Sequence, residues 1–392
     1  MYKQLTEDFH QLYQTNEPVR VFFAPGRVNL IGEHTDYNGG HVFPCALTVG
    51  TYAIVRQRTD RQVRMYSKNF EDIGVIHFHL DDITYDKKHD WANYPKGVIR
   101  IMQQRNLNIE YGFDVLFFGN IPNGAGLSSS ASIELATAVL ANELGQLNVS
   151  MIELVKISQQ AENEFIGVSC GIMDQFAIGM GQKDQAVLLN SDTLSYTYSP
   201  VKLQNEALII TNTNKRRGLA DSKYNERRQQ CEQALAELQT VVNITSLGDL
   251  TVEQFEQHKD AIKDDVRRKR AEHAVYENHR TQEAVTKLKQ GDIAAFGKLM
   301  NDSHKSLRDL YEVTGKELDA LVEAAWAVEG VIGSRMTGAG FGGCTITIVE
   351  KDKVEPFKAQ VGKQYEDATG LKADFYEVEI GDGARELVLN HS

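Results

Sequence analysis

The stretch PNGAGLSSSAS, residues 122–132, places two glycines and a run of serines directly before a predicted helix. Gly124 and Gly126 let the main chain approach an anion without a side-chain clash. The first amides of the following helix have no partner within it, and the helix dipole adds partial positive charge. We therefore expect this stretch to bind phosphate, although it lacks the lysine of the P-loop motif G-x-x-x-x-G-K-[ST].

The missing positive charge can come from a magnesium ion, because a serine hydroxyl can serve as one of its ligands. Such an ion also needs a carboxylate, and Glu162, at the edge of the buried face of a predicted helix, is the candidate. A carboxylate in that position must find a partner. The alternative is an ordinary serine–glycine turn in which a serine side chain caps the helix.

Hydrophobic patterns before and after this loop predict both strands and helices. A strand is expected at residues 19–24, ending at the turn signal Pro25-Gly26, and further strands at 48–57, 61–67, 74–80 and 112–121. Helices are expected at 3–14, 92–105, 129–144 and 150–165, and a hairpin joins 187–190 to 194–198.

The pattern changes near residue 200. A strand at 207–212 is followed by long predicted helices at 220–240, 251–262, 265–289, 292–309 and 315–328. The chain closes with a strand at 344–349, a helix at 353–368 and a strand at 375–380. Because 392 residues exceed one ordinary core, we expect two domains, residues 1–203 and 204–392.

A second motif, APGRVNLIGEHTDYNGG at residues 24–40, crowds polar side chains into one loop after the first predicted strand. Its donors and acceptors suit a polyhydroxylated ligand such as a sugar, since each hydroxyl both donates and accepts a hydrogen bond. A merely solvated loop would explain the polarity. It would not explain the glycines or the apolar Leu30-Ile31 pair, which would anchor the segment.

Two shorter segments add to this pattern. SRMTGAGFGGC, residues 334–344, is a second glycine loop that contacts a ligand, braces the first loop or is only a structural turn. GVSCGIMDQF, residues 167–176, sets Asp174 among glycine and apolar residues. A single carboxylate near a sugar hydroxyl can act as a base, and the alternative is that Asp174 caps a helix.

Composition argues against several classes of protein. The chain has 42 Lys and Arg against 54 Asp and Glu, a net charge of −12, whereas nucleic-acid binding needs a clustered basic face. The run RRKR at 267–270 lies among acidic residues and is interpreted as a solvated helix face. No signal peptide or membrane-length apolar run is apparent, and the cysteines match no metal spacing. We expect a cytoplasmic protein with free thiols and with neither a nucleic-acid nor a membrane partner.

In this order and spacing, the motifs resemble those of the galactokinase family, in the small-molecule kinase superfamily named for galactose, homoserine, mevalonate and phosphomevalonate. GRVNLIGEHTDYN, residues 26–38, is similar to the galactokinase-specific signature, and the two glycine loops are shared by the superfamily. The resemblance spans nearly the whole chain. It implies an α+β, two-domain small-molecule kinase fold. The N-terminal mixed-sheet domain would carry a left-handed βαβ-type nucleotide site, and the C-terminal domain would be a ferredoxin-like α/β sandwich, with the active site between them.

The resemblance also implies roles for individual residues. Asp174 and Arg27 would be catalytic, and Ser130 with Glu162 would hold Mg²⁺. Galactose would lie against Glu33, His34, Thr35, Asp36, Gly171 and Tyr224. ATP would contact Ser67 and, through its phosphates, Gly124, Ala125, Gly126, Leu127, Ser128, Ser129 and Ser130.

The implied reaction is ATP-dependent phosphorylation of the anomeric hydroxyl of α-D-galactose to α-D-galactose 1-phosphate, the first committed step of galactose catabolism. Asp174 would accept the proton, while Arg27 would keep it ionised or contact the phosphoryl group. The alternatives are a kinase for another sugar, such as N-acetylgalactosamine, and a sugar- and ATP-binding sensor without turnover. A monomer is expected.

Overall fold

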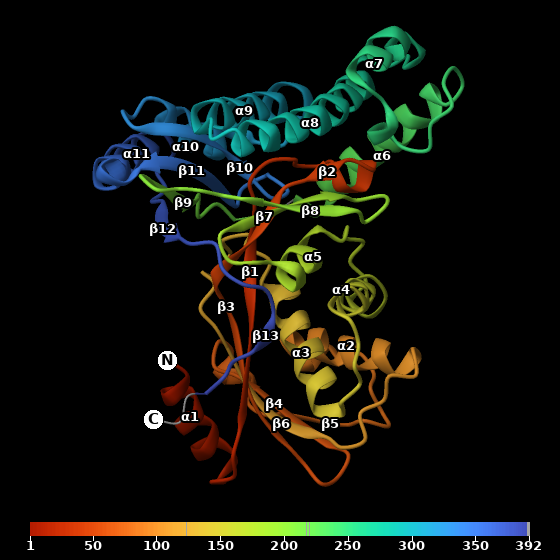
Figure 1. Ribbon diagram of the computed structural model, residues 1–392, viewed down its shortest axis with the longest axis vertical. Coiled ribbons are helices and arrows are strands. Elements are labelled where there is room, and N and C mark those ends of the chain that lie inside the picture. The colour runs from red at the N-terminus through yellow and green to blue at the C-terminus, as the bar shows by residue number, and fades with distance from the viewer. Residues whose placement is uncertain (123, 217, 219, 390–392) are drawn as a thin grey trace.

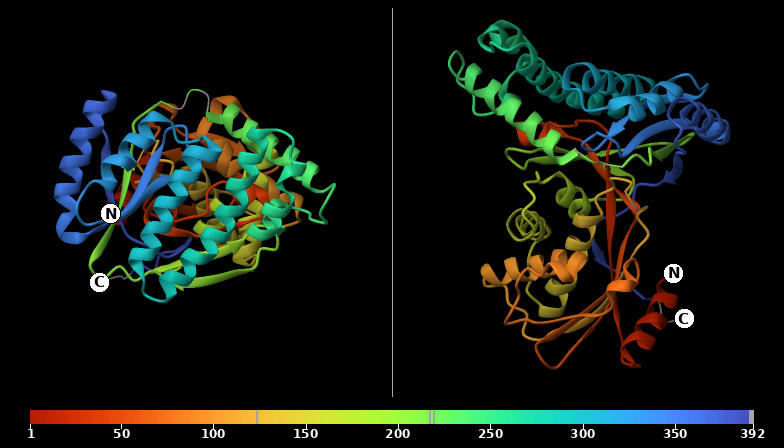
Figure 2. Two further views of the ribbon diagram at one scale, coloured as in Figure 1. Left: turned by 90° about the horizontal axis from the view of Figure 1, so that it is seen from above. Right: turned by 180° about the vertical axis from the view of Figure 1, so that it is seen from behind.

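The structure, a computed structural model, describes residues 1–122, 124–216, 218 and 220–389. Asn123 of the opening loop motif lies outside the described residues. Figure 1 shows an elongated molecule in two parts, with both termini beside helix α1 (Tyr2–Tyr13) at one end. The opposite view in Figure 2 shows the same two parts joined at a narrower middle.

The first part is built on a six-stranded sheet with strand order β13-β1-β3-β6-β4-β5. Its strands are β1 (Arg20–Asn29), β3 (Pro44–Gln57), β4 (Gln62–Ser67), β5 (Ile76–His79), β6 (Phe113–Gly119) and β13 (Arg385–Glu386). All neighbours are antiparallel except β4 and β6, which are parallel, so the sheet is mixed as expected. The last strand, β13, brings the end of the chain back to β1.

Helices cover both faces of this sheet because alternate strand residues point to opposite sides. Val21 and Ile54 face α1 and pack against its buried Phe9. Their neighbours Phe22 and Ala53 belong instead to the core on the other side. That side carries α2 (Asn93–Gln104), α3 (Ser129–Gly145), α4 (Met151–Gln160) and α5 (Met173–Met180) (Figure 1).

The second part is built on a four-stranded antiparallel sheet, β10-β11-β9-β12. Its strands are β9 (Glu206–Asn212), β10 (Val331–Thr337), β11 (Cys344–Glu350) and β12 (Asp374–Val378). Its helices are α6 (Ala220–Leu238), α7 (Val252–His258), α8 (Asp265–Lys289), α9 (Ile293–Ser306), α10 (Gly315–Trp326) and α11 (Val354–Thr369). The chain order β9, helices, β10, β11, α11, β12 is the β-α-β-β-α-β alternation of a ferredoxin-like unit.

A shared hydrophobic core joins the two parts. Ile210 and Ile346, on one face of the second sheet, lie in the same buried cluster as Leu30 and Phe43 of the first part. A small sheet of β2 (His41–Val42), β7 (Gln185–Asn190) and β8 (Tyr196–Pro200) lies between them (Figure 1). Strands β7 and β8 confirm the predicted hairpin.

The prediction that the first strand ends at Pro25-Gly26 is wrong. Strand β1 continues to Asn29, and its pairing with β3 shifts register between Pro25 and Arg27. The shift accommodates proline, which cannot donate a ladder hydrogen bond. A Cβ on Gly26 would lie 2.8 Å from the main-chain oxygen of Leu127, so the strand passes directly against the glycine–serine loop.

Two predicted helices are interrupted by π-helical turns. Helix α4 ends at Gln160 and continues as η4 (Ala161–Ile166), and α9 ends at Ser306 and continues as η7 (Leu307–Tyr311). Such insertions occur often at functional sites. The first one carries Glu162.

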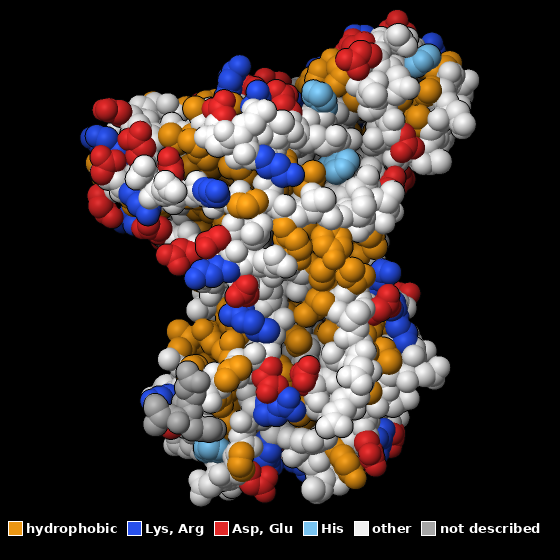
Figure 3. All heavy atoms as spheres, viewed as in Figure 1, with side chains coloured by type: hydrophobic (Ala, Val, Ile, Leu, Met, Phe, Trp, Pro, Cys, Tyr) orange, Lys and Arg blue, Asp and Glu red, His pale blue; other side chains and the backbone are white. Residues whose placement is uncertain are grey.

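The basic run at 267–270 is paired with acidic groups, but its interpretation as a solvated helix face is wrong for Arg270, which is buried. Arg267 contacts Glu237, Arg268 contacts Asp265, and the buried Arg270 contacts Glu312. Figure 3 shows Lys and Arg side chains scattered among acidic ones over the face in view. Among the described residues, no helix combines the length and apolarity needed to cross a membrane.

One buried carboxylate ties three segments of the first sheet together. The Asp114 side chain has no exposed surface and accepts hydrogen bonds from Arg64 at 2.7 and 2.8 Å, from Arg58 at 3.0 Å and from Arg56. Burial alone would raise the pKa of Asp114, but the guanidinium groups of Arg64, Arg56 and Arg58 outweigh burial and lower it. The group therefore stabilises the native state in its ionised form.

We expect Asp114→Asn to lower the free energy of unfolding at pH 7 by about 2 kcal/mol or more, because three partly buried guanidinium groups lose their shared anion. Urea unfolding measures this change. The stabilisation is present above the unfolded-state pKa and is lost as pH falls through the lowered native pKa, so the difference from wild type should shrink in acid.

The control is Asp81→Asn, which removes an exposed ion pair with Arg61 and should leave the free energy of unfolding nearly unchanged. Equal effects of the two substitutions, or a difference for Asp114 that does not depend on pH, would contradict this interpretation.

Candidate functional site

The glycine–serine loop between β6 and α3 has a distinctive main chain. Gly124, Gly126 and Ser128 are left-handed, with φ of 69°, 68° and 64°. Alternation of this conformation with ordinary residues turns successive amides toward one side, which forms an anion-binding concavity. Ser128 lies at the N-cap of α3 but makes no side-chain capping bond, and its buried hydroxyl has no partner among the described residues. Capping by Ser128, the plainer alternative, is therefore wrong.

A cavity of 480 Å³ opens in front of this loop. Its lining includes the residues expected to contact phosphates, namely Gly124, Ala125, Gly126, Leu127, Ser128, Ser129 and Ser130. The side chains of Ala125 and Leu127 belong to the core shared by the two parts. The apolar residues thus hold the loop in place, and the glycines between them present the main chain to the cavity.

Arg27, in β1, joins the loop to the predicted catalytic carboxylate. Its Nε donates to Asp174 Oδ1 at 2.7 Å, and its Nη1 donates to the Gly126 carbonyl at 3.0 Å. Its amide also donates to the Leu127 carbonyl at 3.1 Å. Burial alone would lower the pKa of Arg27, but Asp174 and the nearby carboxylates outweigh burial and raise it, so the guanidinium stays charged.

Asp174 is the second residue of α5, and Ile172 occupies the N-cap position. The alternative that Asp174 caps a helix is therefore wrong. Its side chain is 34% exposed and lines two adjoining cavities, which share Arg27, Cys170, Asp174, Tyr224, Gly338 and Ala339. A reacting group in either cavity can reach this carboxylate.

The second of these cavities, of 120 Å³, is lined by polar groups of the 24–40 motif. Glu33, His34, Asp36, Gly171 and Tyr224, all predicted to contact sugar, belong to its lining. Thr35 does not belong to that lining. It is buried, and its hydroxyl donates to the carbonyls of Gly32 and His41, so it closes the loop on itself.

His34 lines the cavity with both ring nitrogens already bonded within the protein. Nε2 lies 2.8 Å from the Ala339 carbonyl and must carry the hydrogen, because a carbonyl only accepts. Nδ1 then accepts from the Tyr37 hydroxyl at 2.7 Å, and Tyr37 in turn lies 2.5 Å from the Tyr311 hydroxyl. Burial lowers the pKa of His34, which agrees with a neutral ring in one fixed tautomer.

The second glycine loop serves the sugar-side cavity from the other part of the molecule. The Gly338 amide donates to Glu33 Oε1 at 3.0 Å, and Gly338 and Ala339 line the cavity. This loop therefore braces the 24–40 motif, a contact that the sequence did not predict, and it also faces the ligand space.

Asp36 lines this cavity close to Gly171 and near the carboxylates of Asp174 and Glu33. Its Oδ1 accepts from the Tyr37 amide at 3.0 Å, and a Cβ on Gly171 would lie 2.3 Å from its Oδ2. A larger residue at position 171 would therefore displace the Asp36 carboxylate. Burial, together with the nearby carboxylates of Asp174 and Glu33, raises the pKa of Asp36 to about 6.

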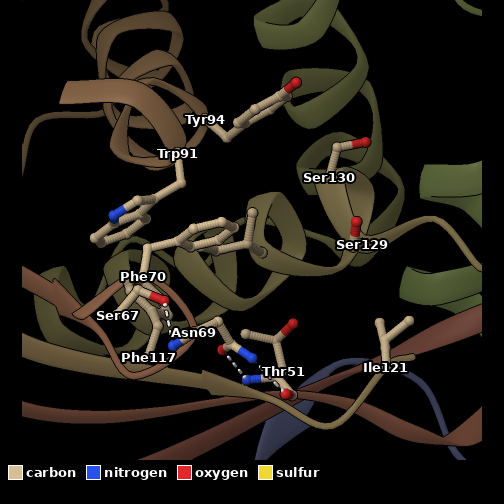
Figure 4. A pocket seen from close by; sticks show the side chains of 12 residues that line it. Thr51, Ser67, Asn69, Phe70, Trp91, Tyr94, Phe117, Ile121, Ser129 and Ser130 are labelled. Carbon is tan, nitrogen blue, oxygen red and sulfur yellow. Dashed lines mark hydrogen bonds between the residues drawn. The ribbon is translucent and has the colours of Figure 1, made fainter. Parts of the chain in front are cut away.

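A third cavity, of 190 Å³, has four aromatic side chains in its wall and adjoins the glycine–serine loop (Figure 4); we call it the aromatic cavity. It shares Ile121, Ser129 and Ser130 with the phosphate-side cavity. Ser67, predicted from the resemblance, lies in its wall, where its hydroxyl accepts from the Asn69 amide at 3.1 Å. The sequence did not predict the aromatic lining residues Phe70, Trp91, Tyr94 and Phe117, because they come from separate strands, helices and loops.

Glu162 lines the phosphate-side cavity with Ser130, and its Oε1 is buried without a partner among the described residues. A second carboxyl, Glu134 of α3, has an orphaned Oε2 and accepts from the Gln175 amide through Oε1 at 3.1 Å. Burial raises the pKa of both carboxyls. The charge of Glu162 raises the pKa of Glu134 further, whereas the pKa of Glu162 is raised by Asp174 and lowered by its contact with Glu134. Sequence reasoning missed Glu134, which it treated as part of an apolar helix.

Comparison with known proteins defines the class. The N-terminal domain model of GHMP kinases matches residues 93–182 and the C-terminal model matches residues 284–367. The mevalonate kinase of Methanococcus jannaschii shares the fold, with a TM-score of 0.65 at 18% identity over 94% of this chain and all of that one. The fold is that of a GHMP-type small-molecule kinase, which confirms the expected α+β class with a mixed sheet.

More similar proteins identify the family within this class. The galactokinase galactose-binding signature matches residues 7–57. The galactokinase of Fusobacterium nucleatum is 63% identical over 385 residues, 98% of this chain and 99% of the relative. The crystal structure of Lactococcus lactis galactokinase complexed with galactose matches with a TM-score of 0.96 and 48% identity, over 98% of this chain and all of that one. The chain belongs to the galactokinase family, as its motifs indicated.

Protonation of the Asp36 carboxyl should make the affinity for galactose depend on pH. Because its pKa is about 6, it is protonated as pH falls below that value and loses an acceptor for sugar hydroxyls. We expect the affinity for galactose, measured by calorimetry without nucleotide, to fall several-fold between pH 7.5 and 5. In Asp36→Asn the affinity should be weaker by about tenfold and less dependent on pH. A wild-type affinity that is constant over this range, or an unchanged pH dependence in Asp36→Asn, would contradict the assignment.

Proposed function

We propose that this chain transfers the terminal phosphoryl group of ATP to the anomeric hydroxyl of α-D-galactose, which gives α-D-galactose 1-phosphate and ADP and opens galactose catabolism. The observation that carries the proposal is the Arg27–Asp174 pair, which lies on the border between a polar cavity and a glycine-loop cavity. A kinase needs its base at such a border, where the acceptor hydroxyl meets the phosphoryl group.

The polar cavity fits a sugar. Carboxylates at Glu33 and Asp36 accept from hydroxyls, and the Tyr224 hydroxyl both donates and accepts. The match to the galactokinase signature and to a galactokinase complexed with galactose supports galactose as the sugar. His34 would contribute the wall of the cavity rather than a hydrogen bond from its ring nitrogens, since both nitrogens are already bonded.

The other two cavities fit ATP. The aromatic cavity offers Trp91, Tyr94 and Phe70 to a flat base (Figure 4), and its shared wall at Ser129 and Ser130 leads to the glycine–serine loop. The amides of that loop and the start of α3 suit the phosphates. A nucleotide lying across both cavities would present its terminal phosphate toward Asp174.

In the proposed step, the Asp174 carboxylate accepts the proton of the anomeric hydroxyl as that oxygen bonds to the γ-phosphorus. The bond between that phosphorus and its bridging oxygen breaks, and ADP leaves with the bond electrons. Arg27 stays charged and fixes the Asp174 carboxylate through its Nε. An ionised aspartate is a weak base at neutral pH, so positioning and charge stabilisation supply most of the rate.

We also propose that Mg²⁺ binds beside Ser130 and Glu162. The residues fit, because the Glu162 Oε1 atom is buried without a partner among the described residues and an added cation would satisfy it. No cluster of three or more His, Cys, Asp or Glu in the described part of the chain is arranged for a metal, so phosphate oxygens and water must complete the shell. The ion would supply positive charge where a P-loop uses lysine.

Further parts of the proposal concern the whole chain. We propose a cytoplasmic monomer, in keeping with a small-molecule substrate, and a domain division into residues 1–203 and 204–392. That division falls in the link between β8, which ends at Pro200, and β9, which begins at Glu206. Strand β13 is the exception, because it returns to the sheet of the first part.

ADP release coupled to a colour change tests the function. Wild type should release ADP with galactose, and excess chelator should abolish release. We expect Asp174→Asn to cut turnover by ~10²-fold or more while leaving galactose and ATP affinity largely intact, because only the proton acceptor is lost. Asp260→Asn, which changes an exposed carboxylate, is the control and should keep wild-type turnover.

A near-normal turnover number in Asp174→Asn would remove that residue from the role of base. No ADP release by wild type with galactose, in a panel that also includes N-acetylgalactosamine, would favour another sugar or a binding protein without turnover.

A further inference from the structure

Helix α8, from the second part of the chain, presses a buried polar face against the sugar loop, which we define as residues 30–41. His273, Glu277 and Thr281 follow one another at four-residue intervals and therefore share one face of the helix. All three are fully buried. A Cβ on Gly32 of the loop would lie 3.0 Å from the Thr281 hydroxyl, so the helix and loop are in close contact.

Glu277 binds the main chain of Glu33. Its Oε2 accepts from the Glu33 amide at 3.1 Å and from the Ser303 hydroxyl at 2.5 Å, while its Oε1 accepts from Arg280 Nε at 2.9 Å. Burial alone would raise the pKa of Glu277, but Arg280, His273 and Arg335 outweigh it and lower the pKa to about 2. An ionised carboxylate makes stronger hydrogen bonds to an amide than a neutral acceptor does.

His273 binds the other main-chain group of the same residue. Its Nε2 lies 3.1 Å from the Glu33 carbonyl and must donate, and its Nδ1 accepts from the Ser306 hydroxyl at 2.7 Å. Burial lowers the pKa of His273 to about 4, so the ring is neutral and has the one hydrogen that this arrangement needs.

The Glu33 side chain is fixed from the second part of the chain as well. Its Oε1 pairs with the buried Arg335 at 3.0 Å and accepts from the Gly338 amide at 3.0 Å. The amide, the carbonyl and one carboxylate oxygen of this single cavity residue are therefore all held by residues more than 200 positions later in the chain.

We propose that Glu277 and His273 are positioning residues for sugar binding, which hold Glu33 in the orientation that the cavity requires. The inference rests on the proposed role of Glu33 in binding galactose. A purely structural role would affect the whole fold, whereas the bonds of Glu277 and His273 converge on one residue of the sugar loop.

Kinetic constants give the first test, in the full-length protein. We expect Glu277→Gln and His273→Phe to raise the Michaelis constant for galactose by about tenfold while changing that for ATP by less than twofold, because the ATP cavities do not include Glu33. His273→Gln keeps an amide donor and should restore most of the galactose affinity.

The matched control is Glu312→Gln. It removes the carboxylate that pairs with Arg270 on the same helix and makes no contact with Glu33. This variant should keep the wild-type Michaelis constants for both substrates.

Hydrogen–deuterium exchange gives a readout that does not depend on turnover. The Glu33 amide should exchange at least tenfold faster in Glu277→Gln than in wild type, and it should be unchanged in Glu312→Gln.

Unchanged exchange at Glu33, or a wild-type galactose constant in folded Glu277→Gln or His273→Phe, would overturn the inference. If both Michaelis constants rise together in these variants, the role is structural and the inference also fails. If wild type releases no ADP with galactose, it is the proposed function that fails, and the exchange measurement still decides whether α8 holds Glu33.

Discussion

The site depends on the hydrogen bonds that Arg27 makes to three other groups. One side chain reaches the Asp174 carboxylate and the Gly126 carbonyl, and the same residue's amide reaches the Leu127 carbonyl. These bonds join β1, α5 and the glycine–serine loop at one point. A buried, charged guanidinium needs hydrogen-bond acceptors close to it. Its acceptors are Asp174 and the Gly126 carbonyl, so Arg27 holds the catalytic carboxylate proposed above next to the glycine–serine loop.

The remaining geometry follows from how the polar segments are anchored. Leu30 and Ile31 of the sugar loop and Ala125 and Leu127 of the phosphate loop all enter the core shared by the two parts of the molecule. Their polar or glycine neighbours are thereby turned toward the cavities. Helix α8 and the second glycine loop complete the enclosure from the other side, where they fix Glu33. In both loops, polar or glycine residues face a cavity, and their buried apolar neighbours hold the main chain in place.

The sequence could predict those parts of the site in which the functional residues and the apolar residues that anchor them are neighbours in the chain. The loop with Gly124 and Gly126, the 24–40 motif and Asp174 are of this kind, and the structure brings them together around two adjoining cavities. The strands and helices were also largely predictable from their hydrophobic periods, apart from the continuation of β1 through Pro25 and the π-helical turn that carries Glu162.

Other parts had no local signal. The aromatic cavity collects residues such as Phe70, Trp91 and Phe117 from segments that meet only in the folded chain. Glu277 and His273 look like ordinary polar positions of a long charged helix, and their burial depends on where α8 docks. Glu134 lies in a helix dominated by apolar residues, so its position beside Glu162 could not be foreseen.

The most direct test of the central claim is a crystal structure with galactose, Mg²⁺ and a non-hydrolysable ATP analogue bound together. The account predicts that the anomeric oxygen lies within hydrogen-bonding distance of Asp174 and that the triphosphate rests against the amides of 124–130, with Arg27 still bonded to Asp174. A triphosphate lodged away from that loop, or a sugar whose anomeric oxygen points away from Asp174, would contradict it.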